Sequence, residues 1–306
     1  MRVRNPLDSD SVSAALVTSG RPWREVELHP ALGSTNTRLR ELLTAPSGPP
    51  RTYAGGPADD VRGLWWVVLT DHQTGGRGRL GRAWTVPDRA SLAVSVAVPV
   101  ADPSQAGWMP LLAGLALARA VREVTEAAGH PLTPRLKWPN DVLLADDGDR
   151  KVSGILCELV AHGSGRADAA GQAVVVGTGV NVDQTREELP VDTATSLTLA
   201  GATVRREDLL VAYLDHLVTV LPGAGSSTGP QAPTASEAAA ARTAYRQACS
   251  TVGLQVRVHL PTGDAVEGTA VGVDDDGGLL VRTKQGVRAF AAGDVVHVRK
   301  ASGGLA

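Results

Sequence analysis

A break at residues 223–236 divides the chain and limits the folds open to it. These residues, GAGSSTGPQAPTAS, are small or polar and lack periodicity, so they cannot bury a core and are predicted to form a linker. A helix is expected after them, over 238–248. Beyond it, apolar residues alternate with polar ones in five short runs, at 254–258, 266–273, 279–283, 287–290 and 295–298. Turn sequences separate the runs, and this pattern predicts a small antiparallel β-barrel or sandwich.

The residues before the linker alternate between strand-like and helix-like segments. Amphipathic patterns predict helices over 107–128 and 208–221. A further helix is expected after Ser34-Thr35-Asn36, an N-cap sequence that precedes leucines at helical spacing. Short apolar runs predict strands, at 64–70, 91–99, 135–137, 142–144, 151–160 and 173–182.

These patterns predict an α+β protein with two domains, since 306 residues exceed the usual size of one domain. Residues 1–30 have no clear period and are expected to form an N-terminal extension packed on the main domain. This main domain is expected over 31–222. The C-terminal domain, with its preceding helix, is expected over 237–306.

Composition excludes several classes of protein. The net charge of −2 gives no basic excess for binding nucleic acid or anionic membrane. Cys157 and Cys249 lie far apart, which argues against a disulfide scaffold or zinc ribbon and favours a reducing compartment. The apolar stretch 109–118 is too short to cross a bilayer, and the N-terminus lacks the apolar core of a signal peptide. We therefore expect a cytoplasmic protein.

The segment 73–84, QTGGRGRLGRAW, indicates an anion-binding site. Glycines allow backbone N–H groups to approach a ligand, while the guanidinium groups of Arg77, Arg79 and Arg82 can reach the same anion. A solvated surface loop or an Arg/Gly tether for nucleic acid would have a similar composition. The anion site is favoured because the segment lies between two strand-like runs and no other basic cluster accompanies it.

Three other segments are each ambiguous when taken alone. Lys137 leaves a strand and is followed by Trp-Pro-Asn-Asp, which either presents a fixed positive charge or forms an ordinary surface turn. Gly154 interrupts a predicted strand where another group approaches its backbone. Gly177 and Gly179 in VGTGVNV either expose backbone to a ligand or make a tight bend.

In this order and spacing, the segments resemble the biotin–protein ligase family. The shared signatures are an S-T-N start, G-R-G-R-x-G-R-x-W, K-W-P-N-D, K-x-x-G-I-L-x-E and G-x-G-x-N, and the match runs from Ser34 to Asn181 and continues more loosely to the C-terminus. The resemblance implies a catalytic domain related to class II aminoacyl-tRNA synthetases, with a mixed, mainly antiparallel sheet backed by helices. It also implies an SH3-like C-terminal β-barrel.

The resemblance further implies an activity. Such an enzyme forms biotinyl-5′-AMP from ATP and biotin with Mg²⁺, and then transfers biotin to a lysine in the biotin carboxyl carrier domain of an acyl-CoA or pyruvate carboxylase. Lys137, Arg77 and Arg79 would act in catalysis by offsetting negative charge where the two substrates meet. Arg79 would also help to retain the reactive intermediate.

The binding residues implied by the resemblance form two overlapping sets. Those for biotin are Ser34, Thr35, Asn36, Gln73, Gly76, Arg77, Gly78, Arg79, Lys137, Gly154, Gly177 and Gly179. Those for ATP are Arg77, Arg79, Arg82, Trp84, Lys137, Asn140, Lys151 and Asn181. No Mg²⁺ ligand is identified, since substrate phosphates and water usually supply most of the ligands of this ion.

Two alternatives are less consistent with the motifs. A lipoate-type ligase would carry a different arginine/glycine signature, which is not found here. A biotin-responsive repressor would carry an N-terminal helix-turn-helix domain, yet only 33 residues precede Ser34. We therefore expect no binding to DNA or membranes, and a monomer or weak homodimer.

Overall fold

The structure is a computed structural model, in which residues 4–18, 21–23, 25–45, 66–100, 103–162, 171–221, 235–260, 263–291 and 293–297 are described. The predicted linker at 223–236 lies outside these ranges, except for residues 235 and 236, which begin a helix.

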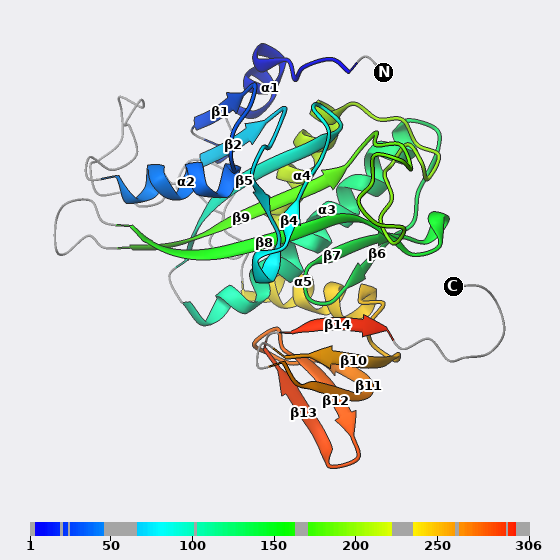
Figure 1. Cartoon of the computed structure of the whole chain (residues 1–306). Helices are drawn as coiled ribbons and strands as arrows, with labels where there is room; N and C mark the ends of the chain where they lie inside the picture. Colours follow the sequence, from blue (N-terminus) through cyan, green and yellow to red (C-terminus); the bar gives the residue numbers. More distant parts are fainter. Residues whose placement is uncertain are drawn as a thin grey trace.

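A seven-stranded sheet forms the main body (Figure 1). Its order is β1-β2-β5-β9-β8-β7-β6, in which β1 is parallel to β2 and all other neighbours are antiparallel. The mixed, mainly antiparallel sheet that the resemblance implied is confirmed. The strands are β1 (Glu25–His29), β2 (Trp66–Thr70), β5 (Ser91–Val100), β6 (Pro134–Lys137), β7 (Asp141–Leu144), β8 (Arg150–His162) and β9 (Gly171–Asn181).

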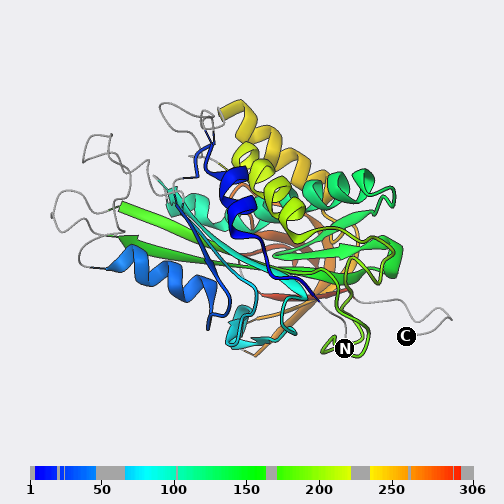
Figure 2. The ribbon, with the colours of Figure 1, turned by 90° about the horizontal axis from the view of Figure 1, so that it is seen from above.

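Helices cover the two faces of this sheet unequally (Figure 2). On one face lie α1 (Ser9–Leu16), α3 (Met109–Ala127), α4 (Arg206–Val220) and α5 (Ala235–Ala248). The other face carries α2 (Thr35–Thr44), which begins at the predicted N-cap Ser34. None of the described helices is both long enough and apolar enough to span a membrane.

Alternating residue sizes on the central strands explain this asymmetry. On β5, Leu92, Val94, Val96 and Val98 join the large core beneath α3 and α4. The intervening residues, such as Ala93 and Ser95, are small, and they point to the opposite face because successive side chains alternate in a strand. Strand β9 repeats the pattern with valines toward the helices and Gly177 and Gly179 on the other face. Small residues therefore leave room there for a ligand.

The N-terminal residues contribute more regular structure than the sequence predicted. Strand β1 forms the edge of the main sheet, with Glu25 aligned with Trp66 and His29 with Thr70. The expected packing against the rest of the chain is present, because Leu16 and Trp23 are buried in the large core. Strand β1 has five residues, and so short an alternation of polar and apolar residues does not identify a strand unless its partner β2 is known.

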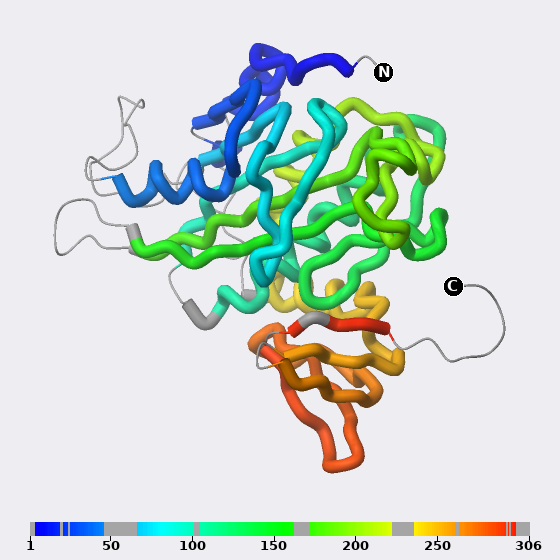
Figure 3. The backbone as a smooth tube through the Cα atoms, viewed as in Figure 1, coloured from blue at the N-terminus to red at the C-terminus, as the bar shows by residue number. Residues whose placement is uncertain are grey.

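The C-terminal residues, orange to red in Figure 3, form a separate antiparallel sheet. Its strand order is β13-β12-β11-β10-β14 (Figure 1). All five predicted strands are confirmed. No pairing between the outer strands β13 and β14 closes the sheet among the described residues. The strands are β10 (Gln255–His259), β11 (Ala265–Val273), β12 (Leu279–Thr283), β13 (Gly286–Phe290) and β14 (Asp294–His297).

Candidate active site

A cavity of about 1410 Å³ lies on the face of the main sheet that carries the small residues. Its size exceeds the 300–1,000 Å³ common for a site that binds one small molecule. The predicted residues that line it are Ser34, Thr35, Asn36, Gln73, Arg77, Gly78, Arg79, Arg82, Trp84, Lys137, Asn140, Lys151, Gly154, Gly177, Gly179 and Asn181. Segments separated by more than a hundred residues thus meet at one site.

Gly76 is the predicted binding residue that does not line the cavity. It pairs with Trp84 across a two-stranded ribbon made of β3 (Gly76–Arg77) and β4 (Ala83–Trp84). A Cβ atom at Gly76 would lie 2.4 Å from the carbonyl oxygen of Trp84, so glycine is required for the ribbon itself.

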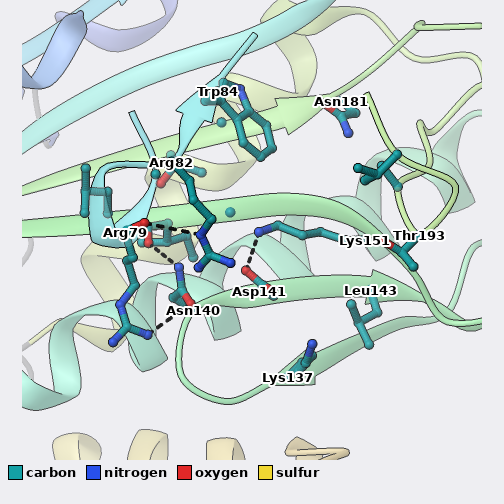
Figure 4. Close-up of a pocket in the computed structure, with 18 of the residues that line it drawn as sticks. Arg79, Arg82, Trp84, Lys137, Asn140, Asp141, Leu143, Lys151, Asn181 and Thr193 are labelled. Carbon is teal, nitrogen blue, oxygen red and sulfur yellow. Dashed lines mark hydrogen bonds and ion pairs between the residues drawn. The ribbon is translucent and has the colours of Figure 1, made fainter. Parts of the chain in front are cut away.

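The Gly/Arg hairpin, residues 73–84, crosses one side of the cavity. The short helix η2 (Arg79–Gly81) forms its tip, which the Gly78 N–H closes by donating to Arg82 O at 2.7 Å. Arg79 Nη1 donates to Asn140 Oδ1 at 3.4 Å (Figure 4). It also donates to the O atom of Gly293, the residue before β14, at 3.3 Å. Leu80 at the tip is 64% exposed and has a left-handed backbone, with φ of 56°.

The base of this hairpin is anchored firmly. Gly75 N–H donates to Gly33 O at 2.7 Å, which ties the hairpin to the residues preceding α2. Just before the hairpin, the buried Asp71 pairs with Arg206 of α4 at 2.7 Å and accepts the N–H of Leu7 at 3.0 Å. No sequence pattern indicates this anchor, because its partners are distant along the chain.

A buried polar network occupies one end of the cavity. Thr35 N–H donates to Gln73 Oε1 at 3.0 Å, and Ser95 Oγ lies 2.7 Å from Thr35 Oγ1 and 2.6 Å from Asn36 Oδ1. Asn36 Nδ2 donates to Glu158 Oε2 at 2.7 Å. Ser95 and Glu158 were not predicted as site residues. A hydroxyl in the middle of the apolar run LAVSVAV was the available signal for Ser95.

The glycines on β9 accommodate side chains of the protein itself. A Cβ atom at Gly177 would lie 2.0 Å from Asn36 Oδ1, and one at Gly179 would lie 2.8 Å from the indole of Trp84. The sequence left open whether these glycines expose backbone to a ligand or make a tight bend, and in the structure the side chains of Asn36 and Trp84 lie against them.

Trp84, Lys151 and Asp141 form a second cluster in the cavity. Lys151 Nζ lies 2.6 Å from Asp141 Oδ1 and 5.6 Å from the centre of the Trp84 ring (Figure 4). The indole nitrogen of Trp84 is buried and has no hydrogen-bond partner among the described residues. An unpaired buried N–H is costly, so this donor is suited to a ligand acceptor.

Loop residues 184–197 form the rim beside this cluster. Asn181 Nδ2 donates to Thr195 O at 2.9 Å, and Asp147 accepts hydrogen bonds from Thr195 and Arg186. Burial acts to raise the pKa of Asp147, but these hydrogen bonds, together with the charges of Arg150 and Arg186, outweigh it and hold the pKa below its usual value. The carboxylate of Asp147 therefore stabilises the rim.

Lys137 reaches the cavity because of strand alternation. Its neighbours Leu136 and Trp138 are each 1% exposed and belong to the large core. The side chain between them must point to the opposite face, where Lys137 lines the cavity (Figure 4).

Charge in the cavity is predominantly positive, although the chain carries a net charge of −2. Five basic side chains line it, against the acidic Asp141 and Asp149. Asp141 is paired with Lys151. The described residues contain no group of three or more metal-ligating side chains. The cavity therefore suits anionic substrates.

Comparisons with known proteins agree with this geometry. Residues 64–181 match the model of the biotin/lipoate A/B protein ligase family, and residues 251–298 match the biotin protein ligase C terminal domain. The chain is 37% identical over 300 residues to the biotin–[acetyl-CoA-carboxylase] ligase of Mycobacterium tuberculosis, covering 97% of this chain and 98% of that protein. It is 30% identical to the enzyme of the same name from Paracoccus denitrificans, covering 78% of this chain and 92% of that protein.

Solved structures show the same fold. The biotin protein ligase from Aquifex aeolicus in complex with biotin and ATP superposes with a TM-score of 0.60 at 23% identity, covering 91% of this chain and all of that one. The likeness extends across both sheets.

Proposed function

Because the chain belongs to the biotin/lipoate A/B protein ligase family, we propose that its cavity holds biotin and ATP together and joins them before biotin is passed to a protein lysine. The near full-length likeness to a biotin–[acetyl-CoA-carboxylase] ligase identifies the reaction as biotin ligation. The observation that carries the proposed site is the meeting of the Gly/Arg hairpin and Lys137 around one positively charged cavity.

Biotin is assigned to the end with the polar network. The hydroxyl and amide groups of Ser34, Thr35, Asn36 and Gln73 match the donors and acceptors of a ureido ring. Ser95 supports this assignment because its buried hydroxyl hydrogen-bonds Thr35 and Asn36, which line the cavity. Gly154, Gly177 and Gly179 line the same cavity, and their lack of side chains makes room for Lys151, Asn36 and Trp84 around the vitamin.

ATP is assigned to the end that contains Trp84 and Lys151. The indole ring offers a stacking surface, and its unpaired N–H offers a hydrogen-bond donor. Lys151 and Arg82 supply positive charge for phosphates. Asn140 and Asn181 also line this end of the cavity. Their side-chain amides donate to Ile155 O and Thr195 O, respectively, and so also hold the cavity wall.

The first chemical step brings two anions together. The biotin carboxylate oxygen attacks the α-phosphorus of ATP, an O–P bond forms, and pyrophosphate leaves with the electrons of the broken bond. Arg77, Arg79 and Lys137 offset the charge that develops between the carboxylate and the phosphate. Mg²⁺ would enter with ATP and neutralise part of the triphosphate charge, with Asp141 and Asp149 as the carboxylates lining the cavity.

The second step uses an amine from the partner protein. The neutral amine of a carrier-domain lysine attacks the carbonyl carbon of the mixed anhydride, an amide forms, and AMP leaves. No nucleophile of this chain is needed, so His72 and the half-buried Cys157 require no catalytic role. We propose the carrier domains of acyl-CoA or pyruvate carboxylases as acceptors.

The test is direct. The protein is incubated with ATP, Mg²⁺, biotin and a biotin carboxyl carrier domain, and mass spectrometry follows the acceptor lysine. We expect the mass of one biotinyl group. Lipoate replaces biotin in a parallel reaction, and a lipoyl adduct without a biotinyl adduct would reassign the cavity to a lipoate ligase. No adduct in either reaction would refute the function.

Finer features of the fold and organisation form part of the proposal. The strand order β13-β12-β11-β10-β14 supports an SH3-like C-terminal domain, and the helix-backed antiparallel sheet supports a class II synthetase-like catalytic domain. We place the boundary between them at 223–236 and treat residues 1–30 as an extension of the catalytic domain. A cytoplasmic monomer or weak homodimer without DNA binding completes the proposal. Binding to duplex DNA with biotin and ATP present would contradict it.

A further inference from the structure

Strand β6 carries Lys137 at the edge of the main sheet, and that edge is covered by the C-terminal part of the chain. The inner edge of β6 pairs with β7, with Lys137 aligned with Asp141. Its outer edge meets residues 249–251, which connect α5 to β10. We call residues 249–251 the edge-covering segment.

Hydrogen bonds from the edge-covering segment fall on both sides of Lys137. On one side, Ser250 donates its backbone N–H and its Oγ to Leu136 O, at 2.8 and 2.9 Å. On the other side, the Trp138 N–H donates to Thr251 Oγ1 at 3.1 Å. The backbone of the lysine is therefore held at the residue before it and the residue after it.

Burial makes the Trp138–Thr251 bond hard to replace with water. Thr251 is fully buried and Trp138 is 1% exposed. Loss of the hydroxyl would leave a buried N–H without an acceptor, so the backbone would have to shift to find one. The indole N–H of Trp138 donates to Gly277 O at 2.9 Å, in the turn between β11 and β12, and adds a second attachment to the C-terminal sheet.

We propose that Thr251 is a positioning residue for Lys137. Through this residue, the edge-covering segment contributes to the geometry of the active site. The inference rests on the proposed function, because it assumes that the ammonium of Lys137 acts on the reacting groups. A long lysine side chain is flexible, so its strand supplies the fixed reference for the ammonium. A misplacement of about 1 Å can cost a reaction about a hundredfold in rate.

Thr125 provides a matched control. It is also fully buried, and its Oγ1 also accepts a backbone N–H, from Leu132 at 3.0 Å. It lies in α3 and does not line the cavity. Each hydroxyl also bonds a further group, Val121 O for Thr125 and His297 Nε2 for Thr251. Both valine variants therefore remove a bond to a buried backbone N–H, and only Thr251→Val removes it beside Lys137.

The experiment measures biotin-dependent ATP–pyrophosphate exchange and thermal unfolding for the wild type and both variants. We expect Thr251→Val to lower kcat about tenfold, with the KM for biotin changed less than about twofold. Thr125→Val should change kcat less than about twofold at a similar loss of Tm. Thr251→Ser retains the hydroxyl and should restore most of kcat. Equal kcat values for the two valine variants would overturn the inference.

A double-mutant cycle tests whether Thr251 acts through Lys137. Adding Thr251→Val to Lys137→Ala should lower the residual kcat less than about twofold, because the group being positioned is absent. A full tenfold drop in that background would contradict the inference. If wild-type protein forms no biotinyl-AMP, the proposed function fails. If wild type is active and Thr251→Val matches Thr125→Val, the inference alone fails.

Ser250→Ala keeps the test decisive if Thr251→Val does not fold. This change removes the Oγ bond to Leu136 O but leaves the backbone N–H bond in place. We expect kcat to fall about threefold without a fall in Tm. An unchanged kcat would overturn the inference.

Discussion

The two sides of the cavity are held in different ways. Lys137 stands on a strand whose adjacent residues are 1% exposed and are hydrogen-bonded to two other segments, the edge-covering segment and the turn at Gly277. The tip of the Gly/Arg hairpin instead rests on long hydrogen bonds from Arg79, and its exposed Leu80 has a left-handed backbone that costs about 1–2 kcal/mol. We therefore propose that the strand side sets the geometry of the reaction. The hairpin side is suited to move over a reactive intermediate and exclude water.

Loss of the strand-side cation should have the largest effect. Lys137→Ala is expected to lower kcat for formation of biotinyl-AMP by about 10²–10³, because one donor aimed at developing charge contributes on that order. Unfolding should be unaffected, since the side chain faces the cavity. Pyrophosphate exchange measures the first quantity and thermal unfolding the second. Lys284→Ala, in the exposed turn between β12 and β13, is the control. A drop below about threefold would remove Lys137 from the chemistry.

Displacing the polar network should have the next largest effect. In Gly177→Ala, the new methyl would lie 2.0 Å from Asn36 Oδ1 and force that amide from Ser95 and Glu158. We expect the KM for biotin to rise about 10- to 100-fold, as for the loss of one or two buried hydrogen bonds. Steady-state kinetics with each substrate varied gives the measurement.

Gly272→Ala is the control for this glycine, because its new methyl would meet only Leu280 Cδ1 at 3.8 Å. A rise in the KM for ATP without a rise in the KM for biotin would show that the polar network binds ATP and not biotin.

Weakening the hairpin side should release the intermediate rather than prevent its formation. Arg79→Gly removes the hydrogen bonds to Asn140 and Gly293, and we expect free biotinyl-AMP to escape about tenfold faster. Filtration after a single turnover measures the escape, and biotin on lysines of an unrelated protein reports the consequence. Arg79→Lys keeps the charge without the planar fork and should give an intermediate rate. Retention equal to wild type would reject this use of Arg79.

The smallest effect concerns the rim. The pKa of Asp147 lies below its usual value, so its carboxylate stabilises the fold above the unfolded pKa of about 3.9, and this contribution is lost as pH falls through the folded pKa. Asp147→Asn should therefore cost about 1 kcal/mol in free energy of unfolding at pH 7 and progressively less toward pH 3. Urea unfolding of the wild type and the variant at pH 7 and pH 3 measures the difference in their free energies of unfolding. A difference that is the same at both pH values would argue against a titrating carboxylate.

Sequence reasoning worked best where one segment carried its own signal. The alternation in SLAVSVAV predicted β5, and the apolar run over 173–182 predicted β9. Sequence reasoning did not predict that β1 belongs to the main sheet. It also did not predict that Asp71 and Ser95 support the site. Each of these depends on a partner far along the chain, such as Arg206 for Asp71, and hydrogen-bonding potential alone does not specify a partner.

The amino-acid sequence by itself determined which residues could lie on the same face of a strand or helix, because side-chain direction follows the local backbone period. It also determined which ligand groups the side chains can bind. The arginines and Lys137 can bind anions, and the polar residues at the N-cap of α2 can hydrogen-bond amide groups, wherever they lie in the fold. Only the tertiary structure decided that they share one cavity and that Thr251 holds the strand beneath Lys137. Strand order and register bring those groups together, and both follow from the packing of the whole chain.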